Sequence, residues 1–247
     1  MGDTTGIAWT QRTWNPWRGC EKISPGCAHC YMFTAQERGG LNPNVITRTK
    51  TWADPFKWNR VATLNDTREM VFTCSWSDWF HEAADAWRPE AWQVVKKADM
   101  LDFQILTKRP GNIPARLPAD WGQGYPNVWL GVSVENDKFT WRLDELRKVP
   151  AAIRFLSIEP LLGPLPKLNL TGIDWVIVGG ESGPGYRPMP HEWVHPIYEQ
   201  CKAEGIAFFF KQSAMPRTEM GIELQGVGIH REYPTPRRVQ PTASGLF

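Results

Sequence analysis

Three cysteines stand close together near the start of the chain, with glycine and proline between them. They are Cys20, Cys27 and Cys30, in the stretch TWNPWRGCEKISPGCAHCY that begins at Thr13. A structural zinc ion takes four protein ligands, and His29, between two of these cysteines, would strain to be the fourth. In a four-iron cluster each iron takes one outside ligand, so three thiolates leave one iron open to an exogenous chelate. The spacing therefore favours a cubane iron–sulfur centre over zinc.

The composition places the chain among globular proteins of a reducing compartment. It has 247 residues, 42% of them hydrophobic, and a formal net charge of +2. Five cysteines, three of them clustered, favour metal or redox chemistry over a disulfide scaffold, and we expect Cys74 and Cys201 to be packed as small hydrophobes. No run of about 18 apolar residues and no signal-peptide pattern occurs. We therefore expect a cytoplasmic protein without a membrane partner.

Apolar runs rich in β-branched and aromatic residues recur along the chain with helix-like segments between them, the order of a parallel α/β sheet. We expect one domain over residues 1–212, a partial or complete parallel (β/α) barrel of TIM type. A C-terminal cap and a flexible tail follow over residues 213–247. The expected strands lie near residues 6–14 and begin at Val71, Phe103, Val128, Ile153, Trp175 and Ala207; the expected helices cover residues 52–64, 89–100, 138–148 and 191–205.

The end of each expected strand turns polar or charged, which places these side chains at one edge of a parallel sheet, where ligands bind. Four cations could hold an anion, such as a carboxylate or a substrate phosphate. Two carboxylates either join that site or neutralise the cations in a structural ion-pair network. The cations are Lys108, Arg109, Arg187 and Lys211, and the carboxylates are Asp78 and Glu159.

Long motifs in order over residues 6–212 carry a resemblance to a known family. They are TWNPWRGC, SPGCAHCY, LTKRP, NVWLGVSVEN, LSIEPLLGP, VIVGGESGP, YRPM and FFFKQ. The chain resembles an uncharacterised phage and prophage three-cysteine protein family that is similar to radical S-adenosylmethionine enzymes. Two features depart from the radical pattern. Six residues separate the first two cysteines, more than is usual, and a Gly-Gly-Glu element at Gly179 comes near the end of the barrel.

The resemblance implies a [4Fe-4S] cluster on the three cysteines, with S-adenosylmethionine chelating the open iron. Reductive cleavage of that cofactor would give methionine and a 5'-deoxyadenosyl radical that abstracts a hydrogen atom from substrate. His29 stands where such enzymes often keep an aromatic near the adenine, and Ser133 and Glu135 are candidates for the ribose hydroxyls. Paired glycines let a ligand approach closely. The candidate cofactor-binding residues are thus His29, Ser133, Glu135, Gly179, Gly180 and Glu181.

The family resemblance and the cationic rim point to a nucleotide or nucleic-acid base as substrate. One concrete case is phage DNA hypermodification, by isomerisation of an amino-acid-bearing thymine in the host cytoplasm. A reductant protein would supply the electron. Two alternatives stay open, a zinc-stabilised nucleic-acid-binding protein and an iron–sulfur redox or repair protein. The residues indicate neither a general acid or base nor an oligomeric state.

Overall fold

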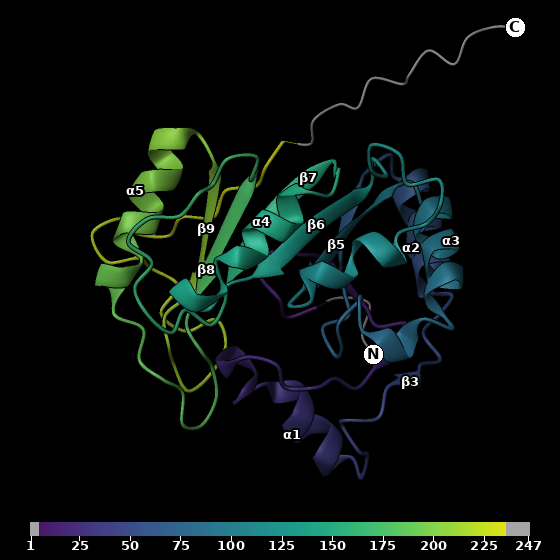
Figure 1. The fold of residues 1–247 in the computed structure, drawn as a ribbon, viewed down its shortest axis with the longest axis horizontal. Helices are drawn as coiled ribbons and strands as arrows, with labels where there is room; N and C mark the ends of the chain where they lie inside the picture. Colours follow the sequence, from purple (N-terminus) through teal and green to yellow (C-terminus); the bar gives the residue numbers. More distant parts are fainter. Residues whose placement is uncertain (1–4, 236–247) are drawn as a thin grey trace, which may run out of the picture.

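The structure is a computed structural model that describes residues 5–235 (Figure 1). Seven parallel strands form one sheet, which curls into a half-barrel in the order β1-β4-β5-β6-β7-β8-β9. Each strand therefore pairs with the next strand of the sheet along the chain, and all their carboxyl ends lie at one edge. The strands are β1 (Arg12–Trp14), β4 (Glu69–Thr73), β5 (Leu101–Thr107), β6 (Val128–Ser133), β7 (Ile153–Ile158), β8 (Trp175–Gly179) and β9 (Ala207–Gln212).

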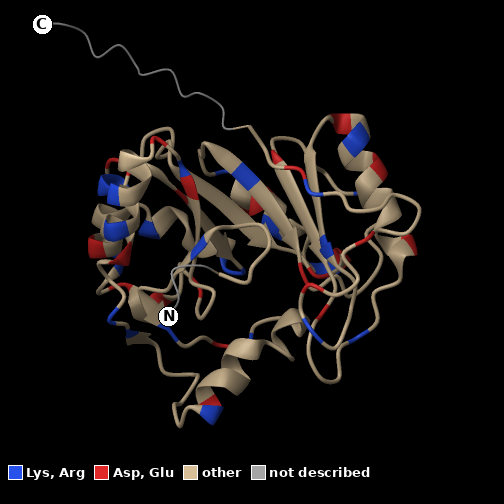
Figure 2. Cartoon of the chain, turned by 180° about the vertical axis from the view of Figure 1, so that it is seen from behind, with Lys and Arg blue, Asp and Glu red and all other residues tan. Residues whose placement is uncertain are grey.

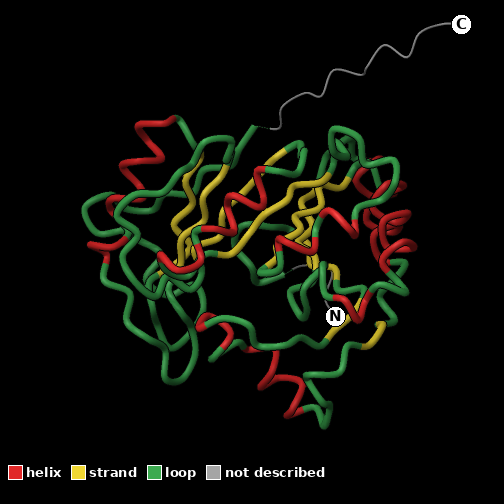
Figure 3. Tube along the Cα trace, in the orientation of Figure 1, coloured by secondary structure: helices red, strands yellow, loops and turns green. Residues whose placement is uncertain are grey.

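Five α-helices lie within the described residues: α1 (Tyr31–Arg38), α2 (Asp54–Leu64), α3 (Arg88–Lys97), α4 (Trp141–Arg147) and α5 (His195–Glu204). A proline lies in the first turn of α2, α3 and α5, where its missing N–H breaks no helical bond. Gly205 ends α5 in the left-handed conformation, at φ 67°. The helices α2, α4 and α5 pack on β5, β6 and β9, beside the single curved layer of strands in Figure 3.

The two faces of the sheet bury separate cores because side chains alternate along each strand. The larger core packs against the helices and includes Val132, Leu156 and Val178. A smaller, aromatic-rich core fills the other face. Its members are Trp9, Phe72, Trp129, Ile153, Phe155, Trp175, Ile177 and Phe209.

Both ends of the described chain close over the smaller core. Trp9 is 3% exposed, its ring centroid lies 6.1 Å from that of Trp175, and its carbonyl accepts a hydrogen bond from Gln104 Nε2 at 3.3 Å. Tyr233 packs on Trp175 with ring centroids 5.5 Å apart, and its hydroxyl donates to the Ala8 carbonyl. The smaller core of the half-barrel is thus covered by two chain segments that are far apart in sequence.

The segment after β9 turns back along that strand. The N–H of Phe210 donates to the His230 carbonyl at 2.8 Å, and the N–H of Glu232 donates to the Phe208 carbonyl at 2.9 Å. Because β9 is the last strand of the sheet, these bonds satisfy backbone groups at an otherwise open edge. Residues 236–247, most of the predicted tail, lie outside the described residues.

The six strands expected from apolar runs and the four expected helices are confirmed within a few residues at each end. The first strand is shorter than the predicted span of residues 6–14, because Trp9 turns into the aromatic core and only Arg12–Trp14 pairs with β4. The helix α1 was not expected. Among the described residues, no helix combines the length and apolarity needed to cross a bilayer.

Candidate functional site

The loop that carries the three cysteines leaves the half-barrel after β1. A short antiparallel pair, β2 (Trp17–Arg18) with β3 (Thr47–Arg48), holds its base. Gly19 adopts φ 96°, and a Cβ there would lie 2.3 Å from the Val45 carbonyl oxygen. The N–H of Cys20 donates to the Pro43 carbonyl at 2.9 Å, and the Cys30 carbonyl accepts the Phe33 N–H at 3.2 Å in the first turn of α1. The backbone of the loop is therefore fixed at both ends.

The three thiols are free but differ in their electrostatic surroundings. Burial, reinforced by the charge of Asp78, raises the pKa of Cys20 to about 12, and burial also raises the pKa of Cys30. Burial acts in the same direction on Cys27, but the ammonium of Lys108 and nearby hydrogen bonds outweigh it and lower the pKa of that thiol. Lys108 Nζ lies 3.7 Å from Cys27 Sγ. Cys27 is thus the thiol most readily ionised.

Glu135, which follows β6, joins the cysteine loop to the mouth of the half-barrel. Its side chain is fully buried, and Oε1 accepts hydrogen bonds from Ser24 Oγ at 2.5 Å and from Lys108 Nζ at 2.7 Å. Oε2 accepts from Arg142 Nη1 at 3.0 Å. A Cβ on Gly26 would lie 2.6 Å from Glu135 Oε1, so only glycine lets the loop approach this closely. Glu135 anchors the loop with both carboxylate oxygens.

Glu181, in the Gly-Gly-Glu element after β8, joins the same loop at a second point. His29 Nδ1 lies 2.9 Å from Oε2, and the Arg187 side chain forms a bidentate ion pair with both carboxylate oxygens. Arg187 Nη2 also donates to the Pro25 carbonyl at 3.0 Å. Burial opposes ionisation of Glu181, but the hydrogen bonds from Arg187 and His29 outweigh it and lower its pKa to about 2.

The two glycines before Glu181 have different neighbours. A Cβ on Gly180 would lie 2.2 Å from the Ala214 backbone nitrogen, so this glycine is required by the close approach of the chain after β9. A Cβ on Gly179 would make only ordinary contacts, 3.4 Å from Glu159 and Lys211. Glycine is therefore required at position 180 by packing within the protein, whether or not a ligand binds nearby.

The other predicted site residues also lie at the carboxyl edge. Asp78 is buried and accepts hydrogen bonds from the Thr107 hydroxyl at 2.7 Å and the Lys108 N–H at 3.0 Å. Lys211 Nζ forms an ion pair with Glu159. Ser133 is buried, and its carbonyl accepts from Arg142.

Three of the four cations predicted to hold an anion are instead paired with a carboxylate of the protein. The side-chain exposures of these carboxylates range from 0 to 23%. The pairs are Lys108 with Glu135, Lys211 with Glu159, and Arg187 with Glu181. Of the two carboxylates expected to neutralise these cations, Glu159 does so, whereas Asp78 accepts from a hydroxyl and backbone N–H groups. Glu135 and Glu181, which were not expected in this role, neutralise the other two cations. Figure 2 shows charges of both signs mixed over the ribbon rather than one long stretch of a single sign.

Sequence reasoning missed Ser24, Arg142 and His81 at this edge. Ser24 and Arg142 both contact Glu135, and His81 lies in the loop after β4. A serine between two cysteines and an arginine in an amphipathic helix carry no distinctive local pattern. Only the position of His81, shortly after a predicted strand, could have suggested it.

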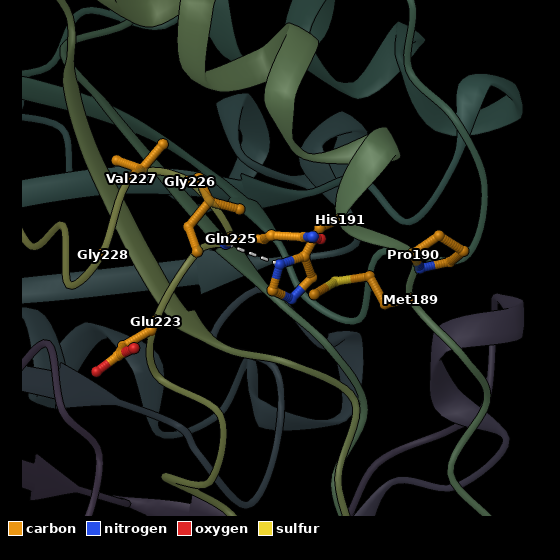
Figure 4. A pocket seen from close by; sticks show the side chains of 9 residues that line it. Met189, Pro190, His191, Glu223, Gln225, Gly226, Val227 and Gly228 are labelled. Atoms are coloured by element: carbon orange, nitrogen blue, oxygen red, sulfur yellow. Dashed lines mark hydrogen bonds between the residues drawn. The ribbon is translucent and has the colours of Figure 1, made fainter.

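A separate cavity of about 680 Å³ lies between the segment before α5 and the turn at residues 223–228 (Figure 4). His191 Nδ1 accepts the Gln225 N–H at 3.0 Å, so in the neutral ring Nε2 carries the proton and donates to Ser213 Oγ at 2.8 Å. Ser213 in turn donates to the Gly221 carbonyl. This histidine therefore does not act as a base toward Ser213, and the cavity contains none of the predicted site residues.

Comparison with known families places the chain by sequence. A family described as "Protein of unknown function (DUF5131)" matches residues 4–234. The chain belongs to the DUF5131 family. The DUF5131 match spans the sheet, the cysteine loop and the segment that returns along β9. No curated protein and no solved structure matches this DUF5131 chain.

Proposed function

We propose that this DUF5131 protein is a radical enzyme that binds a [4Fe-4S] cluster through Cys20, Cys27 and Cys30 and uses S-adenosylmethionine. The observation that carries the proposal is the position of the cysteine loop. Three free thiols lie on one loop, and Glu135 and Glu181 join that loop to the carboxyl edge of a parallel half-barrel. In (β/α) barrels this edge carries the active site, which supports a TIM-type architecture. The radical S-adenosylmethionine part of the proposal rests on the family resemblance.

The preference for a cluster over a single ion rests on donor chemistry, because three thiolates suit a cluster with one open iron, whereas structural zinc takes four protein ligands. Sulfur ligands around one zinc ion lie roughly 3.8 Å apart, because each Zn–S bond is about 2.3 Å long. Within residues 5–235, no group of three or more His, Cys, Asp or Glu side chains is arranged to hold a metal ion. A cubane cluster needs its thiolates farther apart, because each binds a different iron. The charges of Cys20 and Cys30 nevertheless both interact with that of Cys27, which places the three thiols in one neighbourhood.

When bound, the cluster and S-adenosylmethionine would supply a 5'-deoxyadenosyl radical that removes a hydrogen atom from substrate. The protein's own residues position the loop and shape its charge. Lys108 offsets the negative charge of the Cys27 thiolate, while Ser24 holds the loop against Glu135. Arg187 and His29 hold the other end against Glu181. These contacts bury the two carboxylates themselves, whose side-chain exposures are 0% for Glu135 and 6% for Glu181.

For the substrate, we propose a nucleotide or a modified nucleobase, with isomerisation of an amino-acid-bearing thymine as a specific case. A cytoplasmic reductant protein would supply the electron. The substrate proposal is supported by the family resemblance and by Arg109, a predicted cation whose carboxylate neighbour, Glu21, is exposed and lies as far as 3.4 Å from its guanidinium. Such an isomerisation would break an unactivated carbon–hydrogen bond, a step for which a radical is needed.

Anaerobic purification tests the cluster directly. We expect about four irons and four sulfides per chain and a broad visible absorption shoulder. Cys20→Ala, Cys27→Ala and Cys30→Ala should each lose that iron, whereas Cys201→Ala, in α5, should keep it. After reduction with S-adenosylmethionine, the wild-type protein should release 5'-deoxyadenosine.

Three outcomes would contradict the proposal in distinguishable ways. One zinc per colourless chain would favour the zinc-stabilised protein. A cluster that leaves S-adenosylmethionine intact would favour the redox or repair protein. Retention of iron in all three cysteine variants would show that other residues hold it. Far-ultraviolet circular dichroism of each variant separates loss of iron from loss of fold.

A further inference from the structure

His81 presents a buried hydrogen-bond donor with no acceptor. It lies in the loop after β4 and caps the short helix Glu82–Ala84, with Nδ1 accepting the Ala83 N–H at 3.1 Å. The neutral ring therefore carries its proton on Nε2. The residue is 4% exposed, and Nε2 is buried without a hydrogen-bond partner. A buried donor left unpaired is costly, and such groups in native proteins often mark a site for a ligand or water.

Arg109 presents a second unpaired donor in the adjacent loop, after β5. Its side chain is 11% exposed, and Nε is buried without a partner. Among residues 5–235, the carboxylate nearest to the guanidinium is that of Glu21, with 3.4 Å between Nη2 and Oε2. Because β4 and β5 pair in parallel, the loops that follow them emerge side by side at the carboxyl edge.

A single carboxylate oxygen already lies near both of these side chains. Glu21 Oε2 is 3.8 Å from His81 Nε2 and 3.4 Å from Arg109 Nη2, both longer than a good charge-assisted hydrogen bond. The Glu21 side chain is 60% exposed, so water solvates much of it and it can swing outward at little cost. Its oxygen marks the place where a better-fitting anion would be bound.

The surrounding charges require the ligand to replace Glu21 rather than join it. Asp78 and Glu82 also face this region, but each has hydrogen-bond donors of its own, from Thr107 and from Asn112. An anion added beside the carboxylates of Glu21, Asp78 and Glu82 would be repelled by them. A monoanion that displaces the Glu21 carboxylate leaves the local charge unchanged. Arg109 also lies close enough to Cys20 for their charges to interact, so the site borders the cysteine loop.

We propose that His81 and Arg109 form an oxyanion site that binds a phosphate or carboxylate group of a small molecule, and that Glu21 occupies it when no ligand is present. The site adds to the proposed function, because it predicts that the substrate or cofactor group bound beside Cys20 is an anion. Only this role in the reaction rests on the proposed function. Anion binding itself belongs to the iron-free chain and can be measured without any cluster.

Calorimetric titration of the iron-free full-length chain with inorganic phosphate, and separately with acetate, tests the site. Glu21→Gln removes the competing carboxylate and should tighten binding of at least one anion by about tenfold or more. In the Glu21→Gln background, Arg109→Gln and His81→Asn should each weaken that binding by about tenfold or more. Asparagine at position 81 can still cap the short helix, which preserves the fold. Arg48→Gln, at an exposed ion pair elsewhere, should leave binding unchanged.

Tighter binding of phosphate than of acetate would identify a phosphorylated ligand, and the reverse order a carboxylate, and both support the site. Equal affinities of the wild-type and Glu21→Gln proteins would overturn it, as would double variants that bind as well as Glu21→Gln alone. Absence of binding of either anion to the folded Glu21→Gln protein would overturn it too. None of these results depends on iron, so failure of the cluster proposal is scored separately, by iron content and 5'-deoxyadenosine release.

Discussion

At the scale of single residues, two buried carboxylates have roles that their sequence positions do not show. Glu135 and Glu181 are predicted from their positions after strands to contact a cofactor. In the structure they hold the cysteine loop, through Ser24 and through His29 with Arg187. A carboxylate that already accepts three or four hydrogen bonds has little capacity left for a ligand. The loop geometry on which a cluster depends therefore rests on these two side chains.

The pH dependence of stability should reveal the Glu181 anchor. Its pKa falls from an ordinary value of 4.5 to about 2 in the fold, so its contribution to stability is complete above about pH 4.5 and is lost as the pH falls toward 2. Glu181→Gln should lower the free energy of unfolding by about 2 to 3 kcal/mol at pH 7 and by much less near pH 2. Urea unfolding at several pH values measures this.

The exposed Glu223 supplies a matched control for that measurement. Glu223→Gln should change the free energy of unfolding by less than about 0.5 kcal/mol at every pH. A Glu181→Gln deficit of the same size at pH 3 and pH 7 would show that ionisation of Glu181 is not what stabilises the loop.

At the scale of elements, the packing of β6 against β7 depends on a glycine. Gly131 lies opposite Phe155 in the register of the two strands. A Cβ on Gly131 would lie 2.4 Å from the Phe155 ring, which is held among the other aromatic side chains of the smaller core. In this part of the half-barrel, the Phe155 ring from β7 therefore fills the space above Gly131 in β6.

Gly131→Ala should destabilise the protein by about 1 to 3 kcal/mol through overpacking, measured as a shift in the urea midpoint. Phe155→Leu in the same chain should recover part of that loss, because the smaller side chain leaves room for the methyl group. Gly111→Ala, where a Cβ would meet nothing within 4 Å, is the matched control and should change stability little. A double variant with fully additive losses would argue against the contact.

The elements also show what local patterns can and cannot predict. The runs beginning at Val128 and Trp175 form strands as expected, because β-branched and aromatic side chains suit a sheet buried on both faces. The helix α1 has no side-chain cap, and it starts directly after Cys30. It forms where the cysteine loop ends and was missed because no local start signal marks it.

At the scale of the whole molecule, the half-barrel is completed by segments from outside the sheet. Trp9 enters the aromatic core from the N-terminal side, and Tyr233 covers Trp175 from the C-terminal side. A curled sheet that does not close on itself would otherwise expose this core to water. The termini of the described chain thus serve as part of the core.

Trp9→Ala should therefore lower the free energy of unfolding by about 3 to 5 kcal/mol, a large fraction of a typical domain's stability. Chemical denaturation followed by circular dichroism measures the change. Trp141→Ala, at a 48% exposed position in α4, is the comparison and should cost less than about 1 kcal/mol. Equal losses in the two variants would mean that Trp9 does not pack in the core.

The amino-acid sequence alone determined the strands of the parallel sheet, four of the helices that cover it and the spacing of the three thiols, because hydrophobic periodicity and residue type act over short distances. Only the tertiary structure decided which charges meet. Ser24 and Glu135 are 111 positions apart in the chain, and His29 and Glu181 are 152 positions apart. The same holds for Glu21, His81 and Arg109, which meet because neighbouring parallel strands deliver their loops to one edge. Such pairings depend on how the sheet curls, and no local pattern records that curvature.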